Sequence, residues 1–173
     1  MRLVIAVFLL FVLSACGNTF YIVRHAEKAK PLAGMSVIDA NDPPLSDSGN
    51  LRALALKDLL KSEGIRYIFS TNYKRTINTA KPLDEYLLGA QTELYNPKKD
   101  STDAFIQKLK LIKKGNVLVV GHSNTIDDIA NKLCGAIVVP ADLKETDYDN
   151  LYKIKRKGNK YTFKGLTYGV TTE

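Results

Sequence analysis

The sequence has few of the residues and patterns that mark specialised protein classes. Among 173 residues it has two cysteines, two histidines and no tryptophan, and it contains no internal repeat or low-complexity stretch. With 45% hydrophobic and 25% charged residues, its composition excludes disordered, collagen-like and coiled-coil chains. A chain of this length can form one domain with a substantial hydrophobic core, plus a short leader or tail.

Basic residues are in excess, with 25 Lys and Arg against 18 Asp and Glu. Much of the excess lies in two lysine pairs and near the C-terminus, at 98–99, 113–114, Lys153, Lys155, Arg156, Lys157, Lys160 and Lys164. No aromatic residues interleave with them in a nucleic-acid-binding motif. We therefore interpret the charge as a solvated basic surface and expect no nucleic-acid partner. Such a surface is compatible with anionic substrates or lipid headgroups.

An apolar run at the N-terminus is too short to span a bilayer comfortably. Met1 and Arg2 precede LVIAVFLLFVLSA, and one basic residue, a short apolar core and small residues are typical of a secretory signal peptide. The run ends in Leu13-Ser14-Ala15-Cys16, which resembles a bacterial lipobox. The alternative is a buried first strand or helix that ends in a chance cysteine.

The lipobox resemblance implies a lipoprotein. Residues 1–15 would be the signal peptide, 16–18 the lipid anchor on Cys16 and a short linker, and 19–173 the domain. The protein would lie in a bacterial cell envelope, on the periplasmic side of a membrane. Gly17 is not an acidic retention signal, which favours the outer membrane. Cys134 would then be the only free thiol, and its apolar neighbours predict a buried, inert side chain.

Strands and helices alternate along the rest of the chain. Apolar and β-branched runs predict strands at 19–23, 65–69, 92–95 and 117–120. Helical spacing predicts helices that begin after Ser46 and end before Gly64, and at 74–88, 103–113 and 126–133. Residues 151–155 and 161–166, joined by a turn at 157–159, predict a hairpin. Together these elements predict an α/β three-layer sandwich, in which a mostly parallel central sheet carries the C-terminal antiparallel hairpin at one edge.

The apolar spacing also predicts which helix faces are buried. Ser46 is the expected cap of the first helix, whose inward residues would be Leu51, Leu54, Ala55, Leu59 and Leu60. The second helix would bury Ile77, Ala80, Leu83, Leu87 and Leu88, with Pro82 as a candidate kink.

Three polar clusters each follow a predicted strand, at Arg24-His25, 70–75 and 121–124. Ligands of parallel sheets bind beyond the carboxyl ends of the strands, so we expect these clusters to meet at one edge. Both histidines, His25 and His122, lie beside charged or glycine-rich turns, which favours a functional role over a structural one.

The arginines in these clusters indicate the ligand. Arg24 and Arg75 supply planar donors suited to a phosphoryl group. The alternative role for two histidines is a zinc site. Zinc needs three or four protein ligands, however, and no further ligand shows recognisable spacing. Neighbouring arginines also oppose a dication. We therefore predict a phosphate site without metal or cofactor.

Four motifs together resemble the histidine phosphatase (phosphoglycerate mutase-like) superfamily. They are RHAE at 24–27, PLSDSG at 44–49, STNYKRT at 70–76 with the following Thr79-Ala80, and VGHSN at 120–124. Ala26 stands where the commonest signature has glycine. The motifs occur in the family's order over nearly the whole chain after the leader, so the chain resembles a small bacterial lipoprotein-type member.

The resemblance implies a role for each motif residue. His25 would be the nucleophile and carry the phosphoryl group as a phosphohistidine, while Arg24 and Arg75 hold the nonbridging oxygens and His122 completes the pocket. The arginines would also keep His25 unprotonated and its lone pair free for attack. Ser123 and Asn124 are further candidates for substrate binding, although we expect Asn124 to cap the next helix.

Many members of the superfamily protonate the leaving group with a carboxylic acid, and this part is unclear here. Glu93 is the nearest match and is our candidate general acid, although an exposed strand residue is the simpler interpretation. The other candidates are Glu27, Asp42, Asp100, Asp103 and Asp149. Short length and an unclear acid resemble the phosphohistidine-phosphatase-like branch more than the mutases.

The sequence therefore predicts a metal-independent phosphatase of the phosphoric monoester hydrolase type. Its substrate would be a phosphomonoester or a phosphoramidate, either a small phosphorylated compound or a phosphohistidine peptide, selected by loops 28–45 and 135–149. A lipid-anchored phosphate-binding or scaffold protein without turnover is the open alternative, and a phosphomutase a weaker one.

Overall fold

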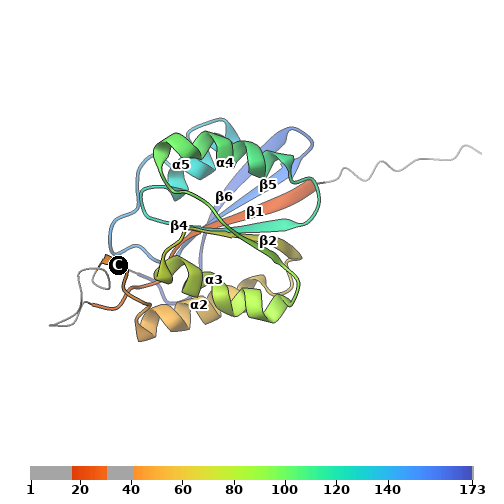
Figure 1. Ribbon diagram of the computed structural model, residues 1–173. Coiled ribbons are helices and arrows are strands. Elements are labelled where there is room, and N and C mark those ends of the chain that lie inside the picture. The colour runs from red at the N-terminus through yellow and green to blue at the C-terminus, as the bar shows by residue number, and fades with distance from the viewer. Residues whose placement is uncertain (1–16, 31–40, 173) are drawn as a thin grey trace, which may run out of the picture.

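The computed structural model of the chain describes residues 17–30 and 41–172 (Figure 1). The predicted signal peptide at 1–15, Cys16 and the middle of the predicted loop 28–45 lie outside the described residues. A six-stranded sheet lies between two layers of helices, which confirms the predicted α/β three-layer fold. Within the described residues, none of the helices is long and apolar enough to cross a membrane.

The elements follow the predicted alternation. They are β1 (Gly17–Arg24), α2 (Asp47–Leu60), β2 (Ile65–Ser70), α3 (Lys74–Leu87), β3 (Gln91–Leu94), α4 (Lys99–Leu111), β4 (Asn116–Gly121), α5 (Ile126–Cys134), β5 (Asn150–Lys157) and β6 (Lys160–Thr167). The sheet order is β3-β2-β4-β1-β5-β6. The first four strands in that order are parallel, and β5 and β6 add the antiparallel hairpin.

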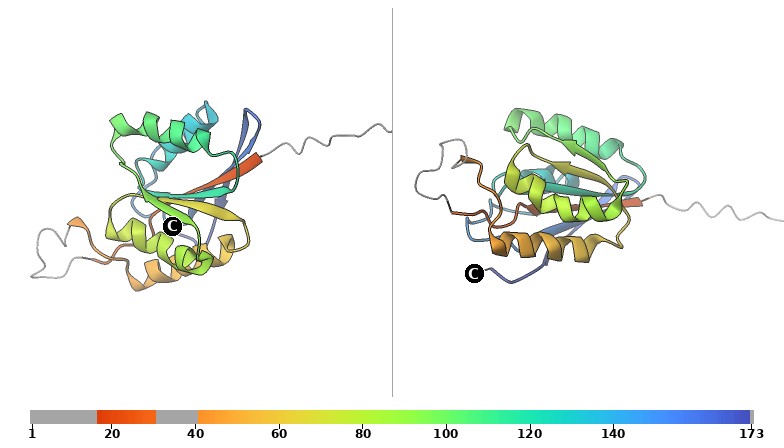
Figure 2. Two further views of the ribbon diagram at one scale, coloured as in Figure 1. Left: turned by 45° about the vertical axis from the view of Figure 1, so that its right-hand side comes forward. Right: turned by 60° about the horizontal axis from the view of Figure 1, so that its bottom comes forward.

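The centre of the sheet consists of β1 and β4, because both strands are apolar on both faces. Residues 20–23 and 117–120 are at most 2% exposed. Strands that are apolar on both faces require helices on either side of the sheet. Accordingly, α4 and α5 cover one face, and α2 and α3 cover the other (Figures 1 and 2).

The buried faces of α2 and α3 agree only in part with the predicted ones. Ser46 does cap α2, since its hydroxyl accepts a hydrogen bond from the Gly49 amide at 3.1 Å. The buried residues of α2, however, are Gly49, Arg52, Ala53, Leu56 and Leu60, and those of α3 are Thr76, Thr79, Ala80 and Leu83. The prediction is confirmed for Leu60, Ala80 and Leu83. It is wrong for five residues that are exposed, Leu51, Leu54, Leu59, Ile77 and Leu88, because an arginine and two threonines point inward instead. Cys134 is half-buried, and burial raises the pKa of its thiol.

Candidate active site

The three polar clusters meet at the carboxyl ends of β1, β2 and β4, around a cavity of about 510 Å³. In the β1–β4 ladder Arg24 lies opposite Gly121, and the His25 amide donates to the Gly121 carbonyl at 2.9 Å. This register brings the rings of His25 and His122 to a centroid distance of 5.6 Å. The cavity is lined by all six predicted site residues, Arg24, His25, Arg75, His122, Ser123 and Asn124.

Backbone contacts hold the ring of His25 in one orientation. Its Nδ1 lies 2.8 Å from the Ala26 carbonyl oxygen, which can only accept, so Nδ1 carries the proton and Nε2 keeps its lone pair. The Ala26 amide in turn donates to Thr79 Oγ1 at 2.9 Å. The side chain of Thr79, which lies on α3, thereby holds the backbone of Ala26, the residue whose carbonyl contacts the ring.

The environment of His25 keeps its imidazole neutral. The residue is only 4% exposed. Burial, followed by the charges of Arg24 and Arg75, lowers the pKa of His25 to about 3, although its hydrogen bond to Ala26 acts in the opposite direction. At neutral pH the ring is therefore unprotonated and able to act as a nucleophile through Nε2.

His122 follows the neighbouring strand β4, and its pKa is lowered as well. Its Nε2 lies 2.9 Å from Thr71 Oγ1, which lies 2.9 Å from the hydroxyl oxygen of Thr76 at the start of α3. Burial, followed by the charges of Arg75 and Arg24, lowers the pKa of His122 to about 4. Both rings in the cavity are therefore neutral near pH 7.

Two guanidinium groups are among the positive charges that line the site. Arg24 is 1% exposed and donates to the Lys144 carbonyl at 2.7 Å, with its Cζ atom 4.1 Å from the ring centroid of Tyr148. The Cζ atom of Arg75 lies 4.4 Å from the ring centroid of Tyr73. The Nε atoms of both arginines are buried without an acceptor among the described residues. A buried donor without a partner costs about 1–3 kcal/mol, so both arginines can gain from an anionic ligand.

Each arginine also contacts a carboxylate from a neighbouring loop. Glu145 Oε2 lies 3.1 Å from Arg24 Nη2, and its other oxygen accepts from Ser123 Oγ at 3.4 Å. Asp42 Oδ1 lies 3.3 Å from Arg75 Nη1. Sequence reasoning missed Glu145, because it lies in an irregular acidic stretch, and without periodicity the direction of its side chain could not be predicted. It also missed the cavity residues Lys28, Lys98, Asp142, Leu143 and Thr125.

The candidate general acid Glu93 lies outside the cavity. It is an exposed residue of the edge strand β3 and forms an ion pair with Lys108. Among the described residues, the carboxylates that line the cavity are those of Asp142 and Glu145 instead.

The remaining acid candidates have other surroundings. Asp42 forms an ion pair with Arg75, Glu27 with Arg52, and Asp103 with Lys132. Asp149 accepts a hydrogen bond from the hydroxyl of Thr172. Asp100 is exposed in the first turn of α4.

Asn124 does not cap α5, contrary to the prediction. The N-cap position belongs to Thr125, and the Thr125 and Ile126 amides both donate to the His122 carbonyl, at 3.1 and 3.2 Å. The helix begins at Ile126, as predicted, so its N-cap is Thr125, and Asn124 lies at the cavity wall. Within the described part of the chain, no three His, Cys, Asp or Glu side chains are grouped so as to hold a metal ion.

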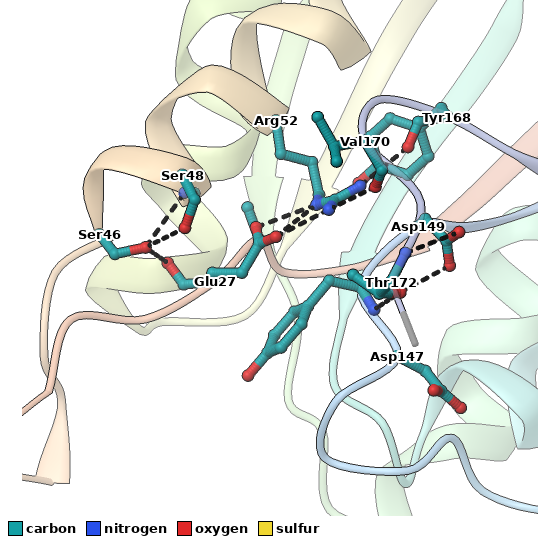
Figure 3. Close-up of polar contacts among 12 residues, drawn as sticks. Glu27, Ser46, Ser48, Arg52, Asp147, Asp149, Tyr168, Val170 and Thr172 are labelled. Carbon is teal, nitrogen blue, oxygen red and sulfur yellow. Dashed lines mark hydrogen bonds and ion pairs between the residues drawn. The ribbon is translucent and has the colours of Figure 1, made fainter.

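A buried ion pair fixes the segment that follows His25 (Figure 3). Arg52 Nη2 lies 2.7 Å from Glu27 Oε1, and Arg52 Nε lies 2.9 Å from Glu27 Oε2. The same guanidinium donates to the carbonyls of Tyr168 and Val170, both at 2.8 Å. A Cβ atom on Gly49 would lie 2.1 Å from the Glu27 carbonyl oxygen, so only glycine lets α2 pack this closely. The segment that follows His25 is thus bound to both α2 and the C-terminal segment.

The parallel part of the sheet brings two neutral histidines and two arginines to one cavity, and such a set of side chains is suited to binding a phosphoryl group. A sequence-family model, the histidine phosphatase superfamily (branch 1), matches residues 20–96. Residues 20–96, which are less than half of the chain, thus resemble this superfamily. No curated protein sequence matches the chain significantly.

Several solved structures share the fold over most of their length. A protein of Agrobacterium tumefaciens assigned as the phosphohistidine phosphatase SixA has 16% identity and a TM-score of 0.63, over 88% of this chain and 97% of its own. A protein of Escherichia coli assigned as an alpha-ribazole-5'-P phosphatase has 16% identity and a TM-score of 0.64, over 88% and 98%. Phosphoglycerate mutase from Bacillus anthracis has 17% identity and a TM-score of 0.55, over 88% and 93%. At these identities the likeness establishes the shared fold.

Proposed function

We propose that the chain is a metal-independent phosphatase that forms a phosphohistidine on His25. The observation that carries this proposal is the state of the His25 ring. The ring is neutral, with a pKa of about 3, and the Ala26 carbonyl binds its Nδ1 proton. It shares one cavity with the guanidinium groups of Arg24 and Arg75. A neutral imidazole beside two phosphate-binding cations is suited to nucleophilic attack on phosphorus.

In the proposed reaction, Nε2 of His25 attacks phosphorus while the bond to the leaving group breaks. The ring gains positive charge as the N–P bond forms, and the Ala26 carbonyl on Nδ1 stabilises that charge. Arg24 and Arg75 bind the nonbridging oxygens, and His122 is the neighbouring hydrogen-bonding group. Water then attacks the phosphohistidine, the N–P bond breaks, and inorganic phosphate and neutral His25 are released.

The substrate class follows from the leaving group. The sequence candidate Glu93 lies outside the cavity, and Glu145 accepts hydrogen bonds from Arg24 and Ser123. We therefore propose substrates whose leaving groups depart with little protonation, such as a phosphoramidate or an aryl phosphomonoester. A phosphohistidine peptide has this chemistry, and the fold of the Agrobacterium protein assigned as SixA is consistent with it.

Hydrolysis of an aryl phosphate in the presence of a chelator tests this proposal. The wild-type chain should retain its turnover, and His25→Ala should lose it while keeping a wild-type unfolding transition. Loss of wild-type turnover with the chelator would favour a metal enzyme. A protein that binds inorganic phosphate but releases none from any aryl phosphate or phosphohistidine peptide would be the phosphate-binding alternative.

We also propose that Cys16 carries a lipid and anchors the domain to a bacterial envelope membrane, on the periplasmic side and preferentially the outer membrane. The lipobox-like residues Leu13-Ser14-Ala15-Cys16 support this. Cys16→Ser should block lipidation and move the protein from the detergent phase to the aqueous phase. Wild-type protein found wholly in the aqueous phase would contradict the anchor.

A further inference from the structure

The end of the sheet opposite the active site carries a cluster of basic side chains around the first residue of β1. The β1–β5 register places Gly17 opposite Lys157, and Lys157 lies opposite Lys160 across the β5–β6 turn. The connection from α4 to β4 adds Lys113 and Lys114. Figure 1 shows that both turns lie beside the start of β1, and Figure 2 shows the same arrangement from a second direction.

Hydrogen bonds hold these segments together. Asn18 Nδ2 donates to the Ile112 carbonyl at 3.2 Å, and Arg156 Nη1 donates to the Lys110 carbonyl at 3.0 Å. The Thr19 amide donates to Asn116 Oδ1 at 2.7 Å. The α4–β4 connection and the hairpin are therefore fixed to the start of β1 in one arrangement.

We call this exposed surface the basic pole, and it comprises Arg66, Lys113, Lys114, Lys155, Lys157 and Lys160. Within residues 17–30 and 41–172, no carboxylate forms an ion pair with Lys114, Lys157 or Lys160. The acidic side chains at this end have other partners. Glu63 pairs with Lys153, and Asp58 pairs with Lys57 and Lys61. The basic pole is therefore a surface of one sign of charge.

We propose that the basic pole binds the headgroups of anionic phospholipids and holds the active site away from the bilayer. Charge complementarity is one reason, because each basic residue at an anionic membrane strengthens binding by about fivefold. The position of the pole is the other reason. Gly17 lies within it, so a chain held at a membrane by the preceding residue brings these lysines to the headgroups.

This orientation limits the substrates of the proposed phosphatase. The eight residues of β1 run from the basic pole to Arg24, a length of about 25 Å. The cavity then faces the aqueous compartment at that distance from the headgroups. Resting on the proposed function, we infer that the substrate is a soluble phosphate compound or peptide and not a phospholipid of the same bilayer.

Lysine labelling of the full, lipid-anchored protein in vesicles tests the orientation. The chain would be reconstituted in phosphatidylcholine alone, or in phosphatidylcholine mixed with phosphatidylglycerol, and treated with a water-soluble amine-reactive reagent. Lys157, Lys160 and Lys114 should label several-fold more slowly in the anionic vesicles, and high salt should remove the difference. Lys81 on α3 and Lys132 on α5 serve as internal controls and should label equally in both.

A charge-matched pair of variants separates the basic pole from total charge. Lys157→Gln with Lys160→Gln should weaken binding of the non-lipidated Cys16→Ser chain to the anionic vesicles by about 25-fold, because each of the two charges contributes about fivefold. Lys81→Gln with Lys132→Gln removes the same charge and should have little effect.

Equal labelling in both vesicles, or equal effects of the two variant pairs, would overturn the proposal. So would protection of the same lysines by a single-stranded oligonucleotide but not by the vesicles, because the surface would then belong to a nucleic acid. Aryl phosphate hydrolysis in the same vesicles reports on the proposed phosphatase separately. A working enzyme without lipid-dependent protection refutes the orientation alone.

Discussion

The Nδ1 atom of His25 lies 2.8 Å from the carbonyl oxygen of the next residue, Ala26. This contact sets the tautomer of the ring, since a carbonyl oxygen accepts but never donates. The Nε2 lone pair is thereby left for attack on phosphorus. The chemistry proposed for the cavity depends on this relationship and on the burial that keeps the ring neutral.

The first prediction concerns pH. The pKa values of His25 and His122 are lowered to about 3 and about 4, so protonation removes the neutral rings only at pH values well below 6. We expect kcat/KM, corrected for substrate ionisation, to change little from pH 7 to pH 5 and to fall below about pH 4. Ring ¹⁵N titration by NMR measures both pKa values directly, and His25→Ala assigns them. A break in both experiments near 6.5, the ordinary histidine value, would contradict the burial argument.

The second prediction concerns Glu145, whose carboxylate forms an ion pair with Arg24. Substrate phosphate must compete with this carboxylate, so Glu145→Gln should tighten inhibition by inorganic phosphate. The Glu145 side chain is 72% exposed, and solvent screening limits the gain to about two- to fivefold. Glu85→Gln, in an exposed pair with Lys81 on α3, is the matched control. Weaker phosphate inhibition in Glu145→Gln would show instead that the carboxylate helps to build the site.

The third prediction concerns the leaving group. General acid assistance is worth about 10²–10⁴-fold, so without it aryl phosphates should exceed alkyl phosphates in kcat/KM by a factor of that order. Glu93→Gln should leave the ratio nearly unchanged, because Glu93 lies on an edge strand and pairs with Lys108. If this substitution instead lowers alkyl phosphate turnover about a hundredfold and spares aryl phosphates, Glu93 is the acid after all.

The fourth prediction concerns the ion pair of Glu27 and Arg52, with side chains 19% and 3% exposed. Removing one partner of a buried pair leaves an uncompensated charge and costs about 3–5 kcal/mol. We expect Glu27→Ala to lower the free energy of unfolding by an amount near the lower end of that range. It should also reduce kcat more than it changes KM, because Glu27 is two residues from His25. Urea unfolding and steady-state kinetics provide the measurements.

Glu85→Ala, which breaks an exposed pair, is the control for this prediction and should unfold like the wild type. A Glu27→Ala protein with wild-type unfolding and wild-type kcat would show that the nucleophile segment holds its position without the ion pair.

The sheet and the position of the site could be predicted from the sequence because they depend on local patterns. Residues 20–23 and 117–120 are apolar on both faces, and such strands can lie only at the centre of a covered sheet. Arg24, His25 and His122 follow these strands directly, so the sheet geometry alone brings them together.

Other features depend on contacts between distant segments, which periodicity does not reveal. Arg52 faces inward because Glu27 and two C-terminal carbonyls meet it there, and an apolar pattern takes a charged residue as exposed. Glu145 reaches Arg24 across 121 residues, from a loop without regular spacing. Asn124 was expected to cap α5, but the turn at His122 places Thr125 at the N-cap position.

Trapping of the phosphorylated enzyme tests the central claim most directly. The wild-type chain would be quenched in alkali during turnover of a ³²P-labelled aryl phosphate, digested, and analysed for the modified residue. A phosphohistidine, stable to alkali and labile to acid, should appear on His25, should remain in the presence of a chelator, and should be absent from His25→Ala. An active enzyme that carries no label on His25, or a His25→Ala protein with full turnover, would contradict the account.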